Sequence, residues 1–461
     1  MTVIDSWAGF LERWNDGDTT TQELTDWKLS SLNNVLRHVY DRSPFYRRHL
    51  DGDVLSIADL SELSRLPFTT KDDLRAAMHD MLCGDITEAQ YYFETTGTTG
   101  PPTPCPRAPI DFKLNWLPFA HALKRITEKH FADESPGPVL AVIAPNDCHS
   151  ACLSLSFAAQ HVGVTKLDLF PISPTLGFSR FFEVLAELRV NMLYCSPGLL
   201  MALAEMSSSY GFEVPDDLSV KVLLTTGEMC SDSMQKLLAE TWKADVYNLN
   251  YGSQEAGAPA LARLDGAQIV VEPTYLLEVI EPDSDVSLGF EGIGELCITS
   301  LVPGLKPLIR YRTGDLVDIK ATPDGLRAMR VLGRTKDVTE IGGRKHSAAQ
   351  IDNAVLVNPT LIYGYEIEVH ADNGHDRLVA RIKAKEGADH GEIKRLVAAS
   401  VSDAFDVPVD VLIHPLLDLK STTGGWVSWK TARIKDFRSG SGPDIESESA
   451  DHLARAAERA I

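Results

Sequence analysis

The sequence predicts an α/β protein with a large N-terminal part and a small α+β unit near its C-terminal end. Apolar runs at 139–144, 190–195 and 220–226 alternate with helical stretches, a pattern typical of parallel strands covered on both faces. Between residues 258 and 331 the apolar runs are shorter and separated by turns, which favours a β-rich subdomain such as a distorted barrel. Helical and strand patterns are mixed beyond residue 335, as expected of a compact α+β domain.

More than one domain is expected, because 461 residues exceed the size of a typical domain and 44% of them are hydrophobic. We assign residues 1–334 to an N-terminal core that holds the parallel sheets and the β-rich subdomain. Residues 335–440 are assigned to the small C-terminal domain. Residues 441–461 read as an acidic tail with a candidate final helix.

The charge balance is acidic, because 44 Lys and Arg residues face 65 Asp and Glu residues, giving a net charge of −21. This balance disfavours a nucleic-acid partner or an anionic membrane. No signal peptide and no membrane-spanning run is recognised. The seven scattered cysteines fit the reduced thiols of a cytoplasmic protein, although Cys148, His149 and Cys152 leave a metal site open.

One loop rich in Gly and Thr is a candidate phosphate-binding loop. It lies in the stretch 91–103, YYFETTGTTGPPT, which starts as an apolar β-type run and closes with prolines. Its glycines allow positive φ and its hydroxyls stand beside backbone N–H groups, so it can wrap phosphate oxygens. No Gly-Lys-Ser/Thr follows, so it is not a Walker loop, and a simple turn stays an alternative. The candidate residues are Thr95, Thr96, Gly97, Thr98, Thr99 and Gly100.

Three predicted strand ends carry small or polar residues, which indicates a ligand site. They are Ser196–Gly198, Thr225–Glu228 and Asn250–Glu255. Ligands of parallel sheets lie beyond the carboxyl ends of the strands, so we expect a binding site along this edge.

Several motifs in the same order resemble the adenylate-forming superfamily, and within it the phenylacetate–CoA ligase branch. LRHVYDRSPFYRRHL and LPFTTKDDLR resemble the N-terminal stretches of that branch, and TTGTTGPPT resembles its phosphate loop. NYGSQE resembles the magnesium and substrate motif, YRTGDL the ribose motif, GRTKD the hinge and SWKTARIKD the terminal lysine motif. The resemblance covers residues from about 30 to about 438.

The resemblance implies an enzyme that uses ATP and Mg²⁺. A carboxylate attacks the α-phosphate of ATP, giving an acyl adenylate and pyrophosphate, and a thiol such as CoA then displaces AMP. The reactants of the first step are both anions, so a cation and a metal suit it. The resemblance also leaves open a homodimer and a role in specialised metabolite biosynthesis.

Two residues carry the implied catalysis, Lys430 and Glu255. Lys430 stands three residues before Arg433, the spacing of the family, although Trp429 replaces the family's glycine. Glu255 is the implied magnesium carboxylate, because hard cations prefer oxygen ligands. Their alternatives are a solvated lysine and a surface glutamate. The implied nucleotide contacts outside the phosphate loop are Gly227, Glu228, Tyr251, Gly252, Asp315, Arg334 and Lys430.

The implied acid pocket is lined mostly by apolar, aromatic or small residues, which favours an aromatic or cyclic acid. It comprises Asn146, His149, Tyr194, Ser196, Gly198, Thr225 and Tyr251. A His149 that only hydrogen-bonds the backbone is an alternative.

The hinge of the family falls on Lys336 in this sequence. The resemblance implies that the C-terminal domain rotates about this position between the half-reactions, and a surface lysine is the alternative.

The acceptor of the acyl group stays open. After the hinge the chain reads IGGRKHSAAQID, with Gly342 where relatives carry Arg. A carrier-protein thiol, an amine or nitrite is therefore an alternative to CoA. A regulatory protein with a decayed nucleotide site and a non-catalytic scaffold are two further classes. The retention of Glu255, Asp315, Arg334 and Lys430 argues against the first.

Overall fold

The computed structural model describes residues 2–50, 52, 55–95, 101–134, 137–146, 148–171, 175–358, 360–372, 374–415, 417 and 433–438. Contacts within the chain divide it into two compact units. Unit 1 comprises Met1–Pro138, Ala144–Asp168 and Asn248–Val331. Unit 2 comprises Val139–Ile143, Leu169–Tyr247 and Leu332–Ile461. The predicted domain boundary at residues 334 and 335 stays a prediction.

Unit 1 begins with helices that start at well-formed caps. Thr2, Thr20 and Thr70 each accept from a backbone N–H three residues later, completing a capping box. The apolar residues spaced for a helix between Leu32 and Val39 form its fully buried face. These helices are α1 (Val3–Asn15), α2 (Thr21–Arg42), α3 (Pro44–His49) and α4 (Lys71–Ala77).

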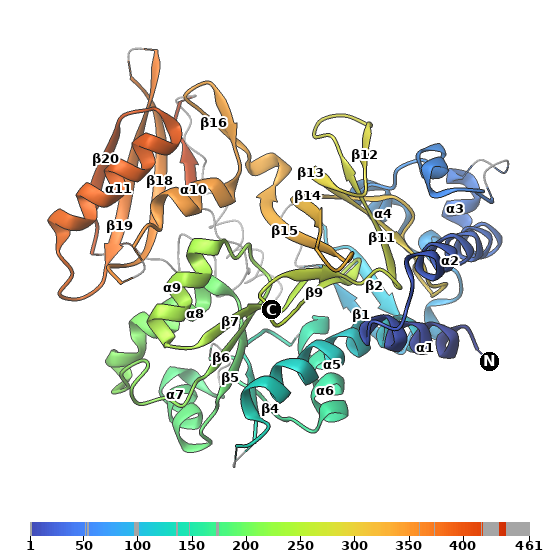
Figure 1. The fold of residues 1–461 in the computed structure, drawn as a ribbon, viewed down its shortest axis with the longest axis horizontal. Coiled ribbons are helices and arrows are strands. Elements are labelled where there is room, and N and C mark those ends of the chain that lie inside the picture. The colour runs from blue at the N-terminus through green and yellow to red at the C-terminus, as the bar shows by residue number, and fades with distance from the viewer. Residues whose placement is uncertain are drawn as a thin grey trace. The chain divides into compact units, whose positions relative to one another are not determined.

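The predicted β-rich subdomain is confirmed as a sheet of eight strands in the described part of unit 1, in the order β12-β11-β13-β14-β15-β10-β9-β8 (Figure 1). Two contacts tie the chain before α4 to this sheet. Arg310, which forms a buried ion pair with Glu278 at 3.0 Å, donates to the Leu66 carbonyl at 2.6 Å, and Thr69 forms a bridge with Tyr311. The strands are β8 (Asn250–Ser253), β9 (Gly257–Ala262), β10 (Gln268–Val270), β11 (Tyr275–Ile280), β12 (Ser287–Gly289), β13 (Gly292–Ser300), β14 (Tyr311–Ala321) and β15 (Arg327–Arg334).

A hairpin and a helix pair complete unit 1. Strands β1 (Tyr91–Glu94) and β2 (Pro104–Arg107) pair antiparallel, with Glu94 opposite Pro104, so the hairpin flanks the Gly- and Thr-rich loop. Helix α5 packs against α6 and against β9. The remaining elements are α5 (Pro109–Phe131), α6 (Ser150–Val162) and β4 (Thr165–Asp168).

Unit 2 contains the predicted parallel strands, with β3, β5, β6 and β7 as neighbours in that order. The pairs β3–β5 and β5–β6 are parallel, and the residues of β5 and β6 are buried throughout, as their apolar sequences predict. The elements are β3 (Val139–Val142), α7 (Gly177–Glu187), β5 (Met192–Cys195), α8 (Pro197–Met206), β6 (Val222–Thr225), α9 (Asp232–Trp242) and β7 (Asp245–Asn248).

The C-terminal part of unit 2 is the expected mixture of helices and strands. Strands β18 and β19 pair antiparallel, and β20 and β21 flank them in the order β20-β19-β18-β21. The elements are β16 (Thr339–Ile341), β17 (Arg344–His346), α10 (Ala348–Val355), β18 (Ile362–Asp372), β19 (His375–Ala384), α11 (His390–Phe405), β20 (Val409–Ile413) and β21 (Ile434–Asp436). Short 3-10 helices elsewhere in the chain lie at Leu60–Arg65, Met78–Met81, Ile86–Glu88, Ser207–Tyr210 and Thr335–Asp337.

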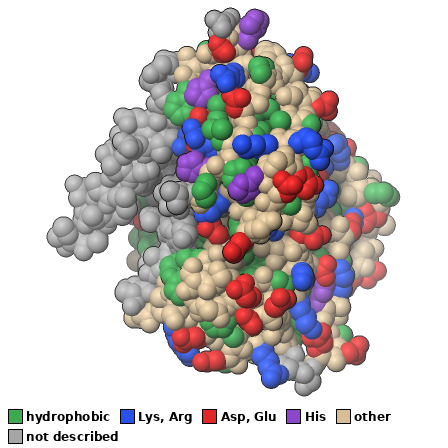
Figure 2. Space-filling model, turned by 90° about the vertical axis from the view of Figure 1, so that its left-hand side faces the viewer, with side chains coloured by type: hydrophobic (Ala, Val, Ile, Leu, Met, Phe, Trp, Pro, Cys, Tyr) green, Lys and Arg blue, Asp and Glu red, His purple; other side chains and the backbone are tan. Residues whose placement is uncertain are grey.

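Acidic and basic side chains are interspersed over the face of the molecule drawn in Figure 2. Within the described ranges, no helix combines the length and the apolar character needed to cross a membrane.

Candidate active site

The base of the candidate phosphate loop is held by Thr95 and Thr103 in unit 1. The Thr95 N–H donates to the Thr103 carbonyl at 3.2 Å, and the Thr103 N–H donates to the Thr95 hydroxyl at 2.9 Å. Thr103 is fully buried. The other predicted loop residues, Thr96, Gly97, Thr98, Thr99 and Gly100, lie outside the described residues.

Glu255 is a buried carboxylate that the fold keeps charged. It lies in the turn between β8 and β9, is 4% exposed, and pairs with the Lys71 ammonium at 3.0 Å. Burial alone would raise the pKa of Glu255, but Lys71 and nearby hydrogen-bond donors hold it below its usual value. An ionised carboxylate of this kind fits the donor preference of a hard cation such as Mg²⁺.

Lys71 is a site residue that sequence reasoning missed. It is the first residue of α4, which begins at the Thr70 cap directly after the Thr69–Tyr311 bridge. Its stretch, LPFTTKDDLR, supported the family resemblance, but the lysine in it was given no role. The separate motif around Glu255 gave no sign that the two residues meet.

The ribose motif and the magnesium motif meet through one short hydrogen bond. The Tyr251 hydroxyl on β8 donates to the Asp315 carboxylate on β14 at 2.6 Å. The Thr313 hydroxyl accepts from the Asp315 N–H at 3.1 Å and fixes the turn. Gly252 follows Tyr251, and a Cβ there would lie 2.5 Å from the Gly257 carbonyl oxygen, so only glycine fits.

Helix α6 begins beside the turn that carries Glu255. The Ser150 N–H at its start donates to the Gln254 side chain at 3.3 Å. His149 caps the helix, because its Nδ1 accepts from the Ala151 N–H at 3.3 Å. Burial lowers the pKa of His149 to about 4, so the ring is neutral at pH 7. This geometry matches the backbone-bonded alternative for His149, while Asn146 is exposed.

Unit 2 brings together residues from the ends of β5 and β6. The Gly198 N–H donates to the Glu228 carboxylate at 3.1 Å, and the Ser196 hydroxyl accepts from the Leu199 N–H and caps α8. Gly227 has a φ of 79°, which suits glycine in the turn after β6.

Two of the predicted pocket residues of unit 2 have their side chains in the interior. Tyr194 is 1% exposed. Thr225 is fully buried, and its hydroxyl donates to the Tyr247 carbonyl at 3.4 Å.

The Asp352 carboxylate on α10 accepts hydrogen bonds from three side chains of unit 2. It accepts from the Ser231 hydroxyl at 2.6 Å, the Tyr365 hydroxyl at 2.8 Å and the Arg433 guanidinium at 2.6 Å. Burial opposes the charge of Arg433, but Asp352 and Glu228 raise its pKa above the usual value. Arg433 is the arginine of the terminal lysine motif.

Lys430, the predicted catalytic lysine of this motif, lies outside the described residues. Lys336, the predicted hinge residue, is exposed in the 3-10 helix Thr335–Asp337, and Arg334 before it is half-buried.

The predicted site residues are therefore distributed over both units. Unit 1 holds Thr95, Asn146, His149, Tyr251, Gly252, Glu255 and Asp315, and unit 2 holds Tyr194, Ser196, Gly198, Thr225, Gly227, Glu228, Arg334 and Lys336. All seven cysteines are free. No cluster of three or more His, Cys, Asp or Glu side chains stands at metal-binding distance among the residues that the structure describes.

No family model matches the chain. The phenylacetate–coenzyme A ligase of Thermus thermophilus is 27% identical over 439 residues, which cover 88% of this chain and 95% of that relative. The Escherichia coli phenylacetate–coenzyme A ligase is 25% identical over 381 residues, covering 80% of this chain and 84% of the relative.

The fold is shared with a crystallised ligase. The structure of a 2-hydroxyisobutyryl-CoA ligase in the postadenylation state, in complex with 2-HIB-AMP, matches with a TM-score of 0.77 at 20% identity. The match covers 92% of this chain and 91% of that one.

Fold, motif order and relatives agree that the chain is similar to the ligases of the adenylate-forming superfamily. The chain is an enzyme, and its similarity to phenylacetate–CoA ligases confirms the resemblance that its motifs predicted.

Proposed function

We propose that this enzyme activates a carboxylic acid with ATP as an acyl adenylate, releases pyrophosphate, and transfers the acyl group to a thiol such as CoA. The observation that carries the proposal is the buried, ionised Glu255, paired with Lys71 in the same unit as the Tyr251–Asp315 pair and the base of the phosphate loop. The acid is proposed to be aromatic or cyclic, because the two relatives reported above are phenylacetate–CoA ligases.

Each of these residues has a defined task in the proposed first half-reaction. Asp315, oriented by the Tyr251 hydroxyl, accepts hydrogen bonds from the ribose hydroxyls of ATP. Glu255 holds Mg²⁺, which offsets the charge on the phosphate oxygens when bound. Lys71 keeps Glu255 ionised, and Lys430 supplies the second cation for the α-phosphate and the attacking carboxylate.

We propose that residues 335–440 form a lid that turns about Lys336 between the two half-reactions. The 3-10 helix at Thr335–Asp337 supports this, because hinge motion is absorbed by a few residues at element ends. A cytoplasmic location is proposed from the free cysteines. We also keep a homodimer as part of the proposal, and this part rests on the family resemblance and not on a contact in the structure.

A different acceptor is the second candidate, and Gly342 favours it. This residue has a φ of 59°, and a Cβ would lie 2.7 Å from the Phe405 carbonyl oxygen. The arginine that relatives carry at this position therefore does not fit here without a backbone shift. An amine, a carrier-protein thiol or nitrite would then replace CoA.

The test is an acid panel incubated with ATP and Mg²⁺, with CoA, amines or nitrite added in separate reactions. Pyrophosphate is measured by a coupled assay and the products by mass spectrometry. The proposal expects acid-dependent pyrophosphate release and a CoA thioester. A product with an amine or nitrite but none with CoA would favour the second candidate. Release of ADP in place of AMP would contradict both.

A further inference from the structure

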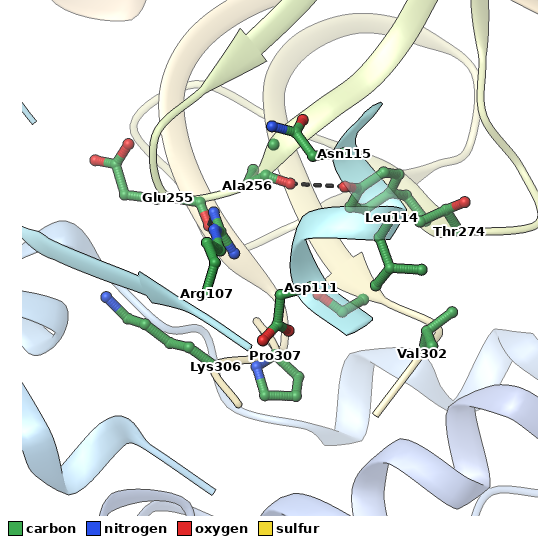
Figure 3. A pocket seen from close by; sticks show the side chains of 13 residues that line it. Arg107, Asp111, Leu114, Asn115, Glu255, Ala256, Thr274, Val302, Lys306 and Pro307 are labelled. Atoms are coloured by element: carbon green, nitrogen blue, oxygen red, sulfur yellow. Dashed lines mark hydrogen bonds between the residues drawn. The ribbon is translucent and has the colours of Figure 1, made fainter. Parts of the chain in front are cut away.

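Two cations of unit 1, the buried Lys306 and the half-buried Arg107, contact backbone carbonyls beside the phosphate loop and in the Glu255 turn. Arg107, the last residue of β2, donates from Nη2 to the Gln254 carbonyl at 2.5 Å and to the Glu255 carbonyl at 2.9 Å. The Lys306 ammonium donates to the carbonyl of Pro104, the first residue of β2. Both side chains line one pocket with Glu255, and Figure 3 shows the three charged groups on the same side of it.

Lys306 is a costly residue to bury. It is 3% exposed, and among the described residues it forms no ion pair, so a backbone carbonyl is the partner of its charge. Burial and the nearby Arg107 charge lower the pKa of Lys306, while Cys105 and Glu255 act in the opposite direction. A methionine would fill this space without the desolvation of an ammonium. Packing alone therefore does not explain why a lysine occupies this position, and we look for a role of its charge.

The loop that carries Lys306 is held in place without its ammonium. The Asp111 carboxylate accepts from the Leu305 N–H at 3.1 Å, and the Leu305 carbonyl accepts from the Cys83 N–H at 2.7 Å. A Cβ at Gly304 would lie 1.8 Å from Asp111 Oδ1, so this approach is available only to glycine. Removal of the Lys306 charge should therefore leave the course of the loop unchanged.

Strand β2 connects these contacts. Its first residue follows Thr103 at the end of the phosphate loop and is held by Lys306, and its last residue, Arg107, holds the carbonyls of the Glu255 turn. We propose that Lys306 and Arg107 are positioning residues that fix the distance between Thr103, at the described base of the phosphate loop, and the turn that carries Glu255. The inference rests on the proposed function, since it assigns ATP phosphates to the loop and Mg²⁺ to Glu255.

The test compares Lys306→Met and Arg107→Lys with a matched control, Lys28→Met. Lys28 is also a buried lysine of unit 1, 9% exposed, but it pairs with Glu272 in a separate cluster with Arg327. Calorimetry gives the Kd for ATP with and without Mg²⁺, and thermal unfolding gives stability. Kinetics gives KM for ATP and for the acid separately.

We expect Lys306→Met and Arg107→Lys to weaken Mg²⁺-dependent ATP binding by about 10- to 100-fold, as losses around metal ligands do. KM for ATP should rise with it, while KM for the acid stays within the range of the control. The Lys28→Met control should lose stability with its ATP affinity unchanged.

The inference is overturned if both variants bind Mg·ATP as tightly as Lys28→Met, or if ATP affinity falls equally without Mg²⁺. If Lys306→Met does not fold, Arg107→Lys decides by the same comparison. A wild type that binds Mg·ATP but releases no pyrophosphate with any acid would reject the proposed function, and the binding data would still decide the positioning role. A wild type that binds no Mg·ATP would reject both.

Discussion

Substitution of Glu255 by glutamine removes one charge from the proposed metal site and changes the shape of the side chain very little. Glu255 is 4% exposed, and its partner Lys71 has a side chain that is 31% exposed. Breaking a fully buried ion pair costs about 3–5 kcal/mol. Water still reaches the Lys71 ammonium, so we expect Glu255→Gln to lower the free energy of unfolding by about 1–2 kcal/mol.

The metal requirement should change much more than stability. Because an amide oxygen is a weaker ligand than a carboxylate, we expect the Mg²⁺ concentration for half-maximal pyrophosphate release to rise about 10- to 100-fold. The folded-state pKa of Glu255 is lowered, so its ionic contribution is present above pH 4.5 and is lost as pH falls through the lowered value. The titration is therefore made at pH 7 to 8.

The control is Glu272→Gln, since Glu272 is 2% exposed and accepts from Lys28 and from Arg327 at 2.9 Å. It lies in the same unit and is equally buried, but it belongs to no predicted nucleotide motif. The control should lose stability without a change in the Mg²⁺ titration. A superimposable titration for Glu255→Gln and the wild type would refute the assignment of Glu255 to the metal.

Four further substitutions test other parts of the site. Tyr251→Phe removes the donor 2.6 Å from Asp315, and KM for ATP should rise by about 10- to 100-fold in steady-state assays, consistent with a charge-assisted bond; an unchanged KM would exclude this orienting role. The pKa of His149 is lowered to about 4, so its neutral form stabilises the fold above pH 6.5, and up to ~3 kcal/mol is lost as pH falls to 4. His149→Asn should flatten that dependence in urea unfolding, and equal slopes would contradict it. Asp352→Asn leaves the Arg433 charge without its carboxylate and should cost about 3–5 kcal/mol in denaturant unfolding; a loss below about 1 kcal/mol would show the contact to be weak. Lys430→Ala should slow adenylation far more than it weakens ATP binding, and an unchanged pyrophosphate rate counts against its catalytic role.

Local patterns predicted most of the fold. Strands β5 and β6 are buried throughout, and apart from Thr225 at the end of β6 their residues are apolar or aromatic. A run of apolar residues depends only on neighbours in the chain, so it can be recognised from a single sequence. The tie between the chain before α4 and the sheet, through Thr69 and Tyr311, depends on distant segments and was not predicted.

The candidate site residues were named one by one from their motifs, and they stay predictions, but the pairings between them were not predicted. Tyr251 and Asp315 were each expected at the nucleotide, whereas their mutual hydrogen bond appears only in the structure. Lys71 and Lys306 resemble solvated lysines in the sequence, because nothing in their own segments reveals the carboxylate or carbonyl that each one meets. The departure at Gly342 was visible in the sequence, whereas the close Phe405 carbonyl, which leaves no room for a Cβ there, appears only in the structure.

The measurement that bears most directly on the proposed chemistry is ATP–pyrophosphate exchange with no acceptor present. Labelled pyrophosphate is added with ATP, Mg²⁺ and each acid in turn, and label is counted in ATP. Reversible adenylate formation predicts exchange that requires one of the aromatic or cyclic acids and that is lost in Lys430→Ala. Absence of exchange with every acid, from a protein that binds Mg·ATP, would contradict the proposal that the chain forms acyl adenylates.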